Sequence, residues 1–413
     1  MTVRKKISLF AGAIAIVAIG IWVACRWEAW FHNPEEPAYA VAGDAPSRVL
    51  LTFGNDGEMS RMVSWMCGDK VDDEAMLLLA DSTDPIRAKA VGEVFASRSG
   101  KAAYYRAEMK ALKPMTRYRY AVVTNGVRSP WYTFRTSDPK SQRFTFLYLG
   151  DVQDTINGIA NKLLKQAVER HPEVEFVAFG GDLIERPMHK YYEETFRSLD
   201  SVCTAMPIIN VTGNHDYLKY LVRKCERRFA LTFPYFLKGQ TERGDENHLF
   251  SFTYHNTQFL LLDSDRGMPS LWAQRQWLRE RLAASEAEHR IVITHHPLYS
   301  VRKKNNNLIQ RWMFNDIILD AGTDLVLQGH EHGYTHCTAD EAPLQGHECR
   351  RPPLYTISHC SPKNYRLHPA ERFHPVFSGS RYYQVVSVDA KGVTMRGYDA
   401  NTNRQIDIVR IKK

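Results

Sequence analysis

The amino-acid sequence predicts an α/β layered domain that is preceded by a small all-β sandwich and by an N-terminal apolar segment. Three features of the 413 residues support this prediction. Residues 48–137 contain short β-type runs with turn residues between them, and from Ser137 onwards strand-like and helix-like patterns alternate. In the second half of the chain, five short apolar runs end in or just before Asp, Asn or His. We therefore divide the chain into residues 1–26, 27–47, 48–137 and 138–413.

The first segment predicts a membrane anchor. Arg4, Lys5 and Lys6 precede the nearly uncharged run Ile7–Cys25, which approaches the ~20 residues that span a bilayer as a helix. Basic residues before such a run favour a cytoplasmic N-terminus, so the rest of the chain is expected to face the periplasm or the extracellular space. A cleaved signal peptide, which would give a secreted protein, and lipid attachment at Cys25 are the alternatives.

Residues 27–47 predict a linker. Pro34, Pro37 and Pro46 lie within this polar stretch, and prolines of this density are typical of extended spacers. We expect it to separate the folded part from the membrane.

Residues 48–137 predict a β-sandwich that serves as a scaffold. Tyr118–Val122 alternate between apolar and polar positions, as a half-buried strand does. No cluster of metal-ligating residue types occurs in this part of the sequence. Six β-type runs are spaced as in a small sandwich: residues 48–53, 61–66, 75–79, 103–109, 117–124 and 131–135.

Residues 138–413 predict alternating strands and helices. Between Ile156 and Ala167 the apolar residues recur at i, i+3, i+4 and i+7, which indicates an amphipathic helix. Charged residues and a glycine in Gln240–His248 indicate a surface loop. Further helices are expected over His189–Met206, after residues 213–216 and over Ser270–Glu286, with closing strands over Arg381–Val388, Gly392–Tyr398 and Gln405–Ile411.

Charge and cysteine spacing exclude several function classes. The net charge is +8, and Arg4, Lys5, Lys6 and Arg26 of the first segment contribute four of these charges. The remaining +4 is diffuse. Because the sequence contains no basic stripe with interleaved aromatic residues, nucleic-acid binding is not expected. A weak attraction for anionic small molecules is consistent with it. The cysteines lack CxxC spacing, which argues against zinc-ribbon and thioredoxin-like sites.

Candidate functional residues follow five apolar runs. Strand ends of a layered sheet bring such residues together, and carboxylate, amide and imidazole groups without thiolate suit a pair of hard or borderline metal ions. The five blocks are Gly150-Asp151, Gly181-Asp182, Gly213-Asn214-His215-Asp216, Thr294-His295-His296-Pro297 and Gly329-His330-Glu331-His332.

These blocks, in this order, resemble those of the calcineurin-like metallophosphoesterases, and within them the purple acid phosphatase branch. The N-terminal part resembles the fibronectin type III-like domain of that branch, on Val63-Ser64-Trp65, the corner at residues 112–118 and the closing run at residues 133–136. The resemblance implies an αββα sandwich and a dinuclear metal centre.

The resemblance also implies a ligand set. Asp182 would bridge the two ions, Asp151 and His332 would hold the first, and Asn214, His295 and His330 would hold the second. Two ions about 3.5–4 Å apart can clamp the attacking and leaving oxygens of a phosphoryl displacement. The mixed donors imply iron together with Zn, Mn or a second Fe.

Three further residues are catalytic candidates. In the family scheme His215 protonates the leaving group, and Asp216 is a candidate to orient its ring. His296 is expected either to reach the substrate phosphate or to pack within the domain.

Two positions depart from the purple acid phosphatase pattern. Glu185 stands where that branch has a metal-binding tyrosine, so no phenolate-to-iron colour is expected. Gln153 stands where many relatives outside the branch have a histidine ligand. Both remain possible ligands of the first ion, Glu185 as a carboxylate and Gln153 through its amide oxygen, and a solvated surface acid is the alternative for Glu185.

The sequence thus predicts an acid phosphatase-like phosphomonoesterase that acts outside the cytoplasm on a phosphorylated small molecule through a metal-bound hydroxide. Residues 186–190, 217–224 and 301–307 are expected to line its cleft. A phosphodiesterase or pyrophosphatase acting on nucleotides or envelope lipids is the first alternative. A surface binding protein with a decayed site is the second. The sequence gives no prediction of oligomeric state.

Overall fold

The computed structural model describes residues 3–39, 45–80, 85–199, 201–235, 248–302, 307–338 and 352–412. The loop predicted at Gln240–His248 lies, except for His248, outside the described residues.

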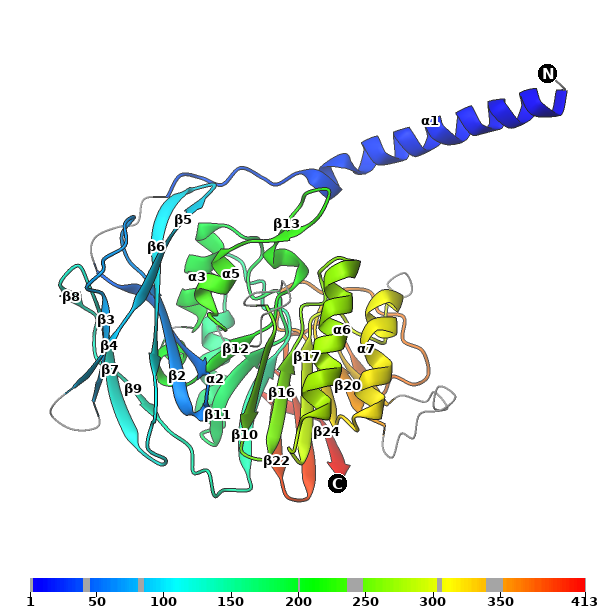
Figure 1. Cartoon of the computed structure of the whole chain (residues 1–413). Coiled ribbons are helices and arrows are strands. Elements are labelled where there is room, and N and C mark those ends of the chain that lie inside the picture. Colours follow the sequence, from blue (N-terminus) through cyan, green and yellow to red (C-terminus); the bar gives the residue numbers. More distant parts are fainter. Residues whose placement is uncertain are drawn as a thin grey trace.

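Two antiparallel sheets form the N-terminal domain (Figure 1). Their inward-facing side chains share one core, in which Leu51, Val63 and Trp65 of the first sheet meet Leu77 and Tyr120 of the second. This confirms the predicted β-rich character of the region, while the fibronectin type III topology stays a prediction. The first sheet has the order β1 (Ser47–Gly54), β2 (Gly57–Met66), β6 (Gly100–Met109), β5 (Val91–Ser97); the second has the order β4 (Ile86–Lys89), β3 (Met76–Ala80), β7 (Arg117–Thr124), β8 (Val127–Arg128), with β9 (Tyr132–Arg135) also on β7.

Two larger mixed sheets form the second domain. The first is six-stranded, with β10, β11 and β12 parallel, and the second is seven-stranded, with β16, β17, β18 and β20 parallel. Their orders are β12 (Ile208–Asn210), β11 (Val174–Phe179), β10 (Phe144–Leu149), β22 (Tyr382–Asp389), β23 (Gly392–Asp399), β24 (Arg404–Lys412), and β15 (Phe250–Tyr254), β16 (Thr257–Leu261), β17 (His289–Thr294), β18 (Leu325–Gln328), β20 (Leu354–Ile357), β19 (Tyr334–Thr338), β21 (Val376–Phe377).

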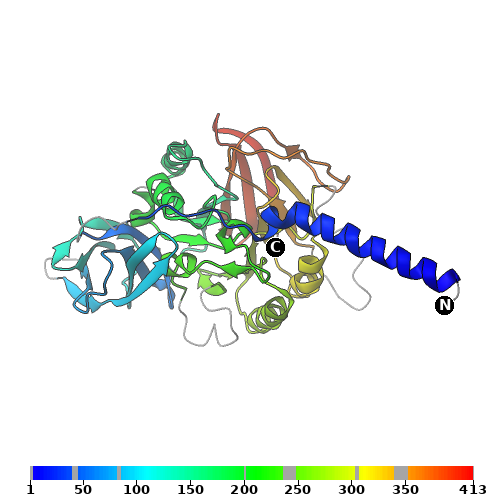
Figure 2. The ribbon, with the colours of Figure 1, turned by 90° about the horizontal axis from the view of Figure 1, so that it is seen from above.

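Alternation along the strands explains why the two sheets stack. Phe259 and Ile291 of the seven-stranded sheet face Phe146 and Phe176 of the other sheet in one core, whereas their neighbours Leu260 and Val292 point to the opposite face and pack under α6 and α7. Successive strand residues point to opposite faces, so each apolar run supplies both cores. Figures 1 and 2 show α6 and α7 on the outer side of this sheet.

The helices differ in detail from the predictions. The helix after Asp151 begins only at residue 160, which leaves Ile156 and Ile159 largely exposed. The helix predicted over His189–Met206 breaks into two, and a short hairpin, not a helix, follows residues 213–216. The helices are α2 (Ala160–Arg170), α3 (His189–Leu199), α4 (Val202–Ala205), α5 (Arg228–Thr232), α6 (Met268–Ala283) and α7 (Leu308–Asp320), with the hairpin β13 (Tyr217–Leu218) and β14 (Lys224–Cys225) before α5.

The N-terminal helix α1 (Val3–Phe31) projects from the body of the molecule (Figures 1 and 2). Within the described part of the chain, no helix combines the length and the apolar character that crossing a bilayer requires. The prediction of a membrane-anchored chain is therefore wrong, because a spanning helix needs about 20 predominantly apolar residues in succession.

The segment predicted as a spacer packs against the second domain. The Glu36 carboxylate is buried and forms an ion pair with Arg228, at 2.7 Å from Nη1, and accepts the main-chain N–H of His189 at 2.6 Å. The Asn33 side chain hydrogen-bonds both the N–H and the carbonyl of Lys219. Residues 32–36 are thus part of the folded body.

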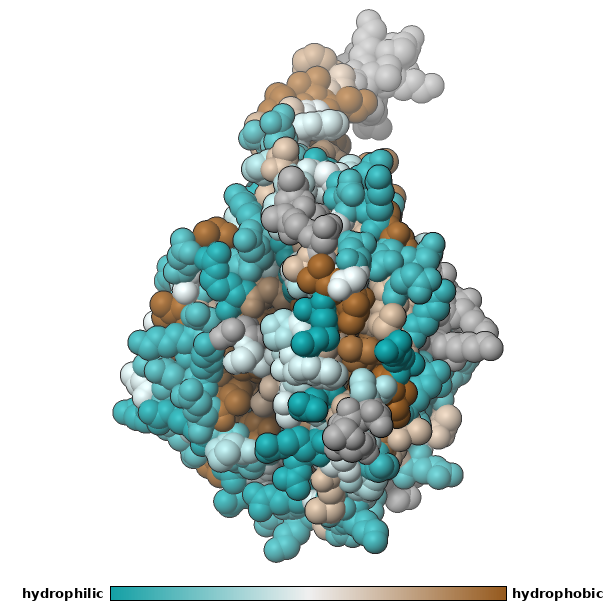
Figure 3. Space-filling model, turned by 90° about the vertical axis from the view of Figure 1, so that its left-hand side faces the viewer, coloured by the Kyte–Doolittle hydropathy of each residue, from teal (hydrophilic) through white to brown (hydrophobic). Residues whose placement is uncertain are grey.

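The two domains are in direct contact. Ser64 Oγ donates to the Thr232 carbonyl at 2.7 Å, and Tyr120 Oη donates to the Thr204 carbonyl at 2.9 Å. Figure 3, from the side on which the N-terminal sheets lie, shows a mainly hydrophilic surface with scattered apolar spots. The two hydrogen bonds from Ser64 and Tyr120 fix the N-terminal domain against the second domain.

Candidate dinuclear metal site

The predicted ligands converge because their strands end together. Asp151 follows β10, Asp182 follows β11 and Asn214 follows β12 in one sheet, while His295 follows β17 and His330 follows β18 in the other. Parallel strands present their carboxyl ends at one edge of a sheet, and the two stacked sheets place these edges side by side.

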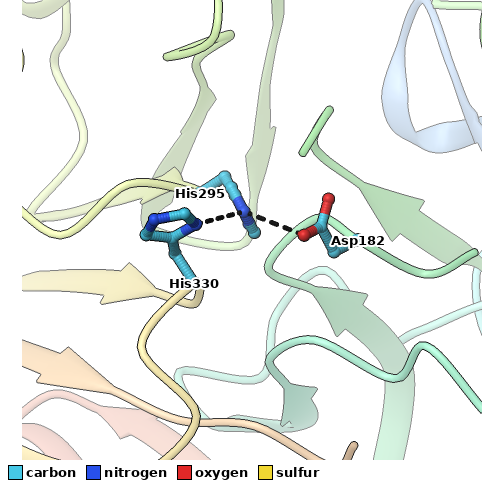
Figure 4. A group of neighbouring side chains, drawn as sticks. All are labelled: Asp182, His295 and His330. Atoms are coloured by element: carbon cyan, nitrogen blue, oxygen red, sulfur yellow. Dashed lines mark hydrogen bonds and ion pairs between the residues drawn. The ribbon is translucent and has the colours of Figure 1, made fainter. Parts of the chain in front are cut away.

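One group of donors surrounds the Asp182 carboxylate. His295 Nε2 lies 3.3 Å from Asp182 Oδ2, and 3.3 Å from His330 Nδ1. Asn214 Oδ1 lies 2.9 Å from His330 Nδ1 and 3.3 Å from His295 Nε2. Figure 4 shows His295 between Asp182 and His330, with the donor atoms of all three turned toward one another.

A second group contains Asp151 and His332. His332 Nε2 lies 3.4 Å from Asp151 Oδ1, and both side chains are buried. The main-chain N–H of His330 donates to Asp151 Oδ2 at 2.6 Å, which joins this group to the first. The two groups together contain all six ligands that the family resemblance implied.

The backbone between the strands and the ligands adopts unusual conformations. Asp182 has φ +49° and His330 has φ +69°, in the left-handed region that non-glycine residues rarely occupy. A side chain at Gly213 would overlap with Asp182, and one at Gly329 would overlap with Asp151. Such local strain is typical of functional sites, and the glycines allow the donor atoms to approach.

Main-chain carbonyls fix the orientation of two imidazoles. His295 Nδ1 lies 2.9 Å from the Gly180 carbonyl, and His332 Nδ1 lies 2.9 Å from the Lys363 carbonyl. Because the carbonyl requires the proton on Nδ1, Nε2 of each ring is the atom that faces the carboxylates and that a metal ion would use. Metal-ligating histidines are usually oriented in this way.

The charges of the site perturb its titration. Burial would lower the pKa of His295, but the carboxylates of Asp182 and Asp151 outweigh it and raise that pKa well above its usual value. Burial likewise opposes ionisation of Asp182, and the adjacent His295 and His215 hold its pKa below the usual range. Burial and the neighbouring His296 and His295 lower the pKa of His330 strongly. A proton on His295 thus balances carboxylate charge that bound cations could balance instead.

The donors present fit a pair of metal ions. Asp151 Oδ1 and Gln153 Oε1 are buried and make no hydrogen bond to any described residue, although buried polar atoms are generally paired. Two carboxylates, an amide oxygen and three imidazoles within one small volume form the donor set of hard and borderline cations. The Asp182 carboxylate lies within the first group of donors, and its bridging role stays a prediction.

His215 lies at the border of the site. Its main-chain N–H donates to Asp182 Oδ1 at 2.7 Å, its Nδ1 contacts the Glu185 carbonyl, and its Nε2 lies 3.9 Å from Asp182 Oδ2. The prediction that Asp216 orients this ring differs from the structure, where the Glu185 carbonyl does so. Asp216 instead accepts the N–H of Gly213 at 2.8 Å and closes the turn, and burial together with the Asp182 charge raises its pKa well above the usual value.

His296 lies beside the group of donors that surrounds Asp182. Its ring centroid is 4.4 Å from that of His330, and its Nδ1 lies 3.1 Å from Ser264 Oγ. Burial, followed by the charge of His295, lowers its pKa to about 3. His296 is therefore a neutral imidazole next to the site.

Glu185 and Gln153, the two residues that depart from the family pattern, contact each other. Glu185 Oε2 lies 2.5 Å from Lys363 Nζ and accepts from Gln153 Nε2 at 3.3 Å. The ammonium group neutralises the carboxylate, which disfavours Glu185 as a metal ligand. The remaining oxygen of Gln153 is unpaired among the described residues, so this residue remains a possible ligand.

Sequence reasoning missed several residues that support the site. Lys363 pairs with Glu185, and the rings of Tyr365 and His359 stack on His332 at 4.2 Å and 5.1 Å. His359 comes two residues after β20. The search for Asp, Asn and His at the ends of apolar runs, which identified the ligands, could therefore have identified His359 as well.

Comparison with known proteins agrees with this geometry. Residues 144–334 match the family model of the calcineurin-like phosphoesterases, and residues 46–136 match that of the purple acid phosphatase N-terminal domain. The chain therefore carries a calcineurin-like phosphoesterase domain behind a purple acid phosphatase N-terminal domain. The family to which the motifs pointed is confirmed.

Individual relatives are more distant. This calcineurin-like chain is 29% identical over 235 residues to serine/threonine-protein phosphatase CPPED1 of Homo sapiens, a match that covers 50% of this chain and 70% of that protein. The counterpart of Pongo abelii is 28% identical over the same shares. The solved structure of GAP50, the anchor in the inner membrane complex of Plasmodium, has a TM-score of 0.47 and 14% identity, covering 66% of this chain and 89% of that one.

Proposed function

We propose that this chain is a metal-dependent phosphatase that hydrolyses phosphomonoesters of small molecules. The observation that carries the proposal is the convergence of six ligand side chains, from five strand ends, beside a histidine that is itself oriented and partly open to solvent. The match to the calcineurin-like phosphoesterase family and the similarity to serine/threonine-protein phosphatase CPPED1 support a phosphatase in the general sense. The preference for phosphomonoesters goes beyond this general support and is part of the proposal.

In this proposal Asp151, His332 and the shared Asp182 would hold one ion, and Asn214, His295 and His330 would hold the other with Asp182. Iron paired with Zn, Mn or a second Fe fits these donors. When bound, such ions supply positive charge to the phosphate oxygens and lower the pKa of a coordinated water. The protein's own contribution is to fix the donors, through the carbonyls of Gly180 and Lys363, before substrate arrives.

His215 would donate a proton to the leaving oxygen. Its Nδ1 is engaged by the Glu185 carbonyl, so its Nε2 is the atom available to the substrate. Its side chain is 26% exposed, unlike the almost fully buried Asp182 and His295, and a leaving group can therefore reach it. Proton transfer by a positioned side chain typically contributes 10²–10⁴-fold to a rate.

The alternatives are disfavoured to different degrees. A decayed site is expected to have lost ligands, whereas all six converge in this structure. A phosphodiesterase or pyrophosphatase uses the same metal chemistry, and only substrate specificity distinguishes it from a phosphomonoesterase.

A substrate panel tests the proposal. Purified full-length protein, reconstituted with Fe, Mn or Zn, is assayed on alkyl and aryl phosphomonoesters and on bis-alkyl phosphodiesters, and its metal content is measured in parallel. We expect about two ions per chain and a higher kcat/KM on monoesters. A higher kcat/KM on diesters would contradict the monoester preference, and a metal content near zero after reconstitution would contradict the enzymatic function.

A further inference from the structure

A cavity of about 230 Å³ opens beside His215 and Asn214, on the side where the leaving group would lie. Its walls come from distant parts of the chain: residues 32–34 after α1, the N-terminal domain, the loop after β11, and the hairpin of β13 and β14. Figure 1 shows the end of α1 meeting the β13 hairpin. Two of the three loops expected to line the cleft contribute to it, at residues 186–188 and at residues 217, 219 and 223.

The charged residues of this cavity are mainly basic. Arg98, Arg186, Lys219 and Arg223 line it, and its single carboxylate, Glu185, is already paired with Lys363. No ion pair joins any of the four basic residues to a carboxylate among the described residues. Burial lowers the pKa of Lys219, and the adjacent charges of Arg186 and Arg223 lower it further. The cavity therefore holds several positive charges that a bound anion would neutralise.

Hydrogen bonds to the main chain hold the walls in place. Arg98 Nη1 donates to the Pro34 carbonyl at 2.7 Å, and Nη2 donates to the Pro187 carbonyl at 3.2 Å. The Asn33 side chain accepts the Lys219 N–H at 2.8 Å and donates to the Lys219 carbonyl at 2.7 Å. These bonds connect the N-terminal domain, the segment after α1 and the β13 hairpin around one opening.

We propose that this cavity binds a second phosphate group on the alcohol part of the substrate, so that the preferred substrate is a small bisphosphorylated alcohol. The proposal rests on the proposed phosphatase function, in which His215 serves the leaving oxygen. Guanidinium groups match the geometry of phosphate through paired hydrogen bonds. A volume of about 230 Å³ is below the roughly 300–1,000 Å³ of sites for drug-sized ligands, which favours a compact anion over a peptide.

The reaction that follows is a simple hydrolysis. A water oxygen forms a bond to the phosphorus at the metal ligands, the bond from phosphorus to the alcohol oxygen breaks, and that oxygen takes up a proton from His215. The products are inorganic phosphate and the alcohol with its second phosphate retained. Water supplies the hydroxyl group of the phosphate and the proton that restores His215, so no other reactant is required.

The test compares two matched substrates, propane-1,3-diol bisphosphate and propyl phosphate, on the metal-loaded full chain. We expect kcat/KM to favour the bisphosphate by about tenfold or more, because hydrogen bonds to charged groups contribute at least this much. In the double variant Arg186→Met and Arg223→Met, the loss should fall mainly on the bisphosphate and lower the preference about tenfold. Both positions are exposed, so the fold should tolerate the changes.

Lys391→Met is the matched control. Lys391 is an exposed basic residue in the turn between β22 and β23, outside the cavity, and its replacement should leave both substrates unaffected. A second readout avoids turnover: calorimetric binding of propane-1,3-bisphosphonate should exceed that of propylphosphonate. The excess should shrink in the double variant and with rising salt, since exposed charges are screened.

The outcomes separate this inference from the proposed function. Hydrolysis of propyl phosphate without any preference for the bisphosphate would overturn the cavity's role and leave the phosphatase function standing. An unchanged preference in the double variant would also overturn it, as would a phosphoserine peptide with acidic neighbours that is hydrolysed faster than the bisphosphate. Failure on every phosphomonoester at full metal content would overturn the proposed function and, with it, the inference.

Discussion

Replacing His215 by alanine should remove a proton donor while preserving the metal site. The residue holds the Asp182 carboxylate through its main-chain N–H, at 2.7 Å from Oδ1, and alanine retains this bond. The lost imidazole is partly exposed, so water can fill its place and no dry cavity forms. The expected effect is therefore on the rate, by about 10²–10⁴-fold for an alkyl phosphate, or roughly 2.7–5.4 kcal/mol in the barrier at 1.36 kcal/mol per factor of ten.

The assay uses two leaving groups. Hydrolysis of an alkyl phosphate requires protonation of a poor leaving oxygen, whereas nitrophenolate departs well without a proton, so nitrophenyl phosphate should lose far less activity. Asn214→Ala is the matched control at the adjacent residue: it removes a predicted ligand, so both substrates should suffer alike and metal content should fall. Equal losses on the two substrates in His215→Ala, together with metal loss, would refute the reasoning and make His296 the next candidate for the acid.

Three further outcomes are expected. Asp182→Asn should abolish activity on every substrate and reduce the content of both metals, because an uncharged bridge weakens both ions; normal metal content with full activity would contradict the shared-ligand assignment. The iron-loaded protein should lack an intense visible absorption band, since Glu185 has no phenolate; a strong band would implicate another tyrosine, with Tyr365 beside His332 the first to replace by phenylalanine. Glu36→Gln should lower the free energy of unfolding by about 1.5–3 kcal/mol, because it removes charge-assisted hydrogen bonds to Arg228, while Glu226 still neutralises the guanidinium. Burial raises the pKa of Glu36 but Arg228 outweighs it and holds that pKa below its ordinary value of 4.5, so the pair's contribution to stability should be present above that pH and lost below it. Thermal unfolding of both proteins between pH 3 and 7 measures this, and an unchanged acid dependence in Glu36→Gln would argue against it.

Local patterns in the sequence were sufficient for the ligands and for most strands. Asp151, Asp182 and His295 could be identified because a buried strand and a polar residue at its end are both encoded by neighbouring residues. The closing strands β22, β23 and β24 were predicted to within one or two residues for the same reason. The helix after Asp151 was placed too early because Ile156 and Ile159 continue the apolar period, although the structure leaves them exposed.

Only the tertiary structure decided which groups orient the site and what surrounds it. The ring of His215 is held by the carbonyl of Glu185 and that of His295 by the carbonyl of Gly180, and a main-chain carbonyl leaves no mark in a sequence because every residue has one. Residues 27–47 look like a spacer by composition, but the partner that holds Glu36 is Arg228, 192 positions away. The basic cavity likewise joins Arg98 to Lys219, since charges so distant along the chain become neighbours only when the N-terminal sandwich packs against the layered domain.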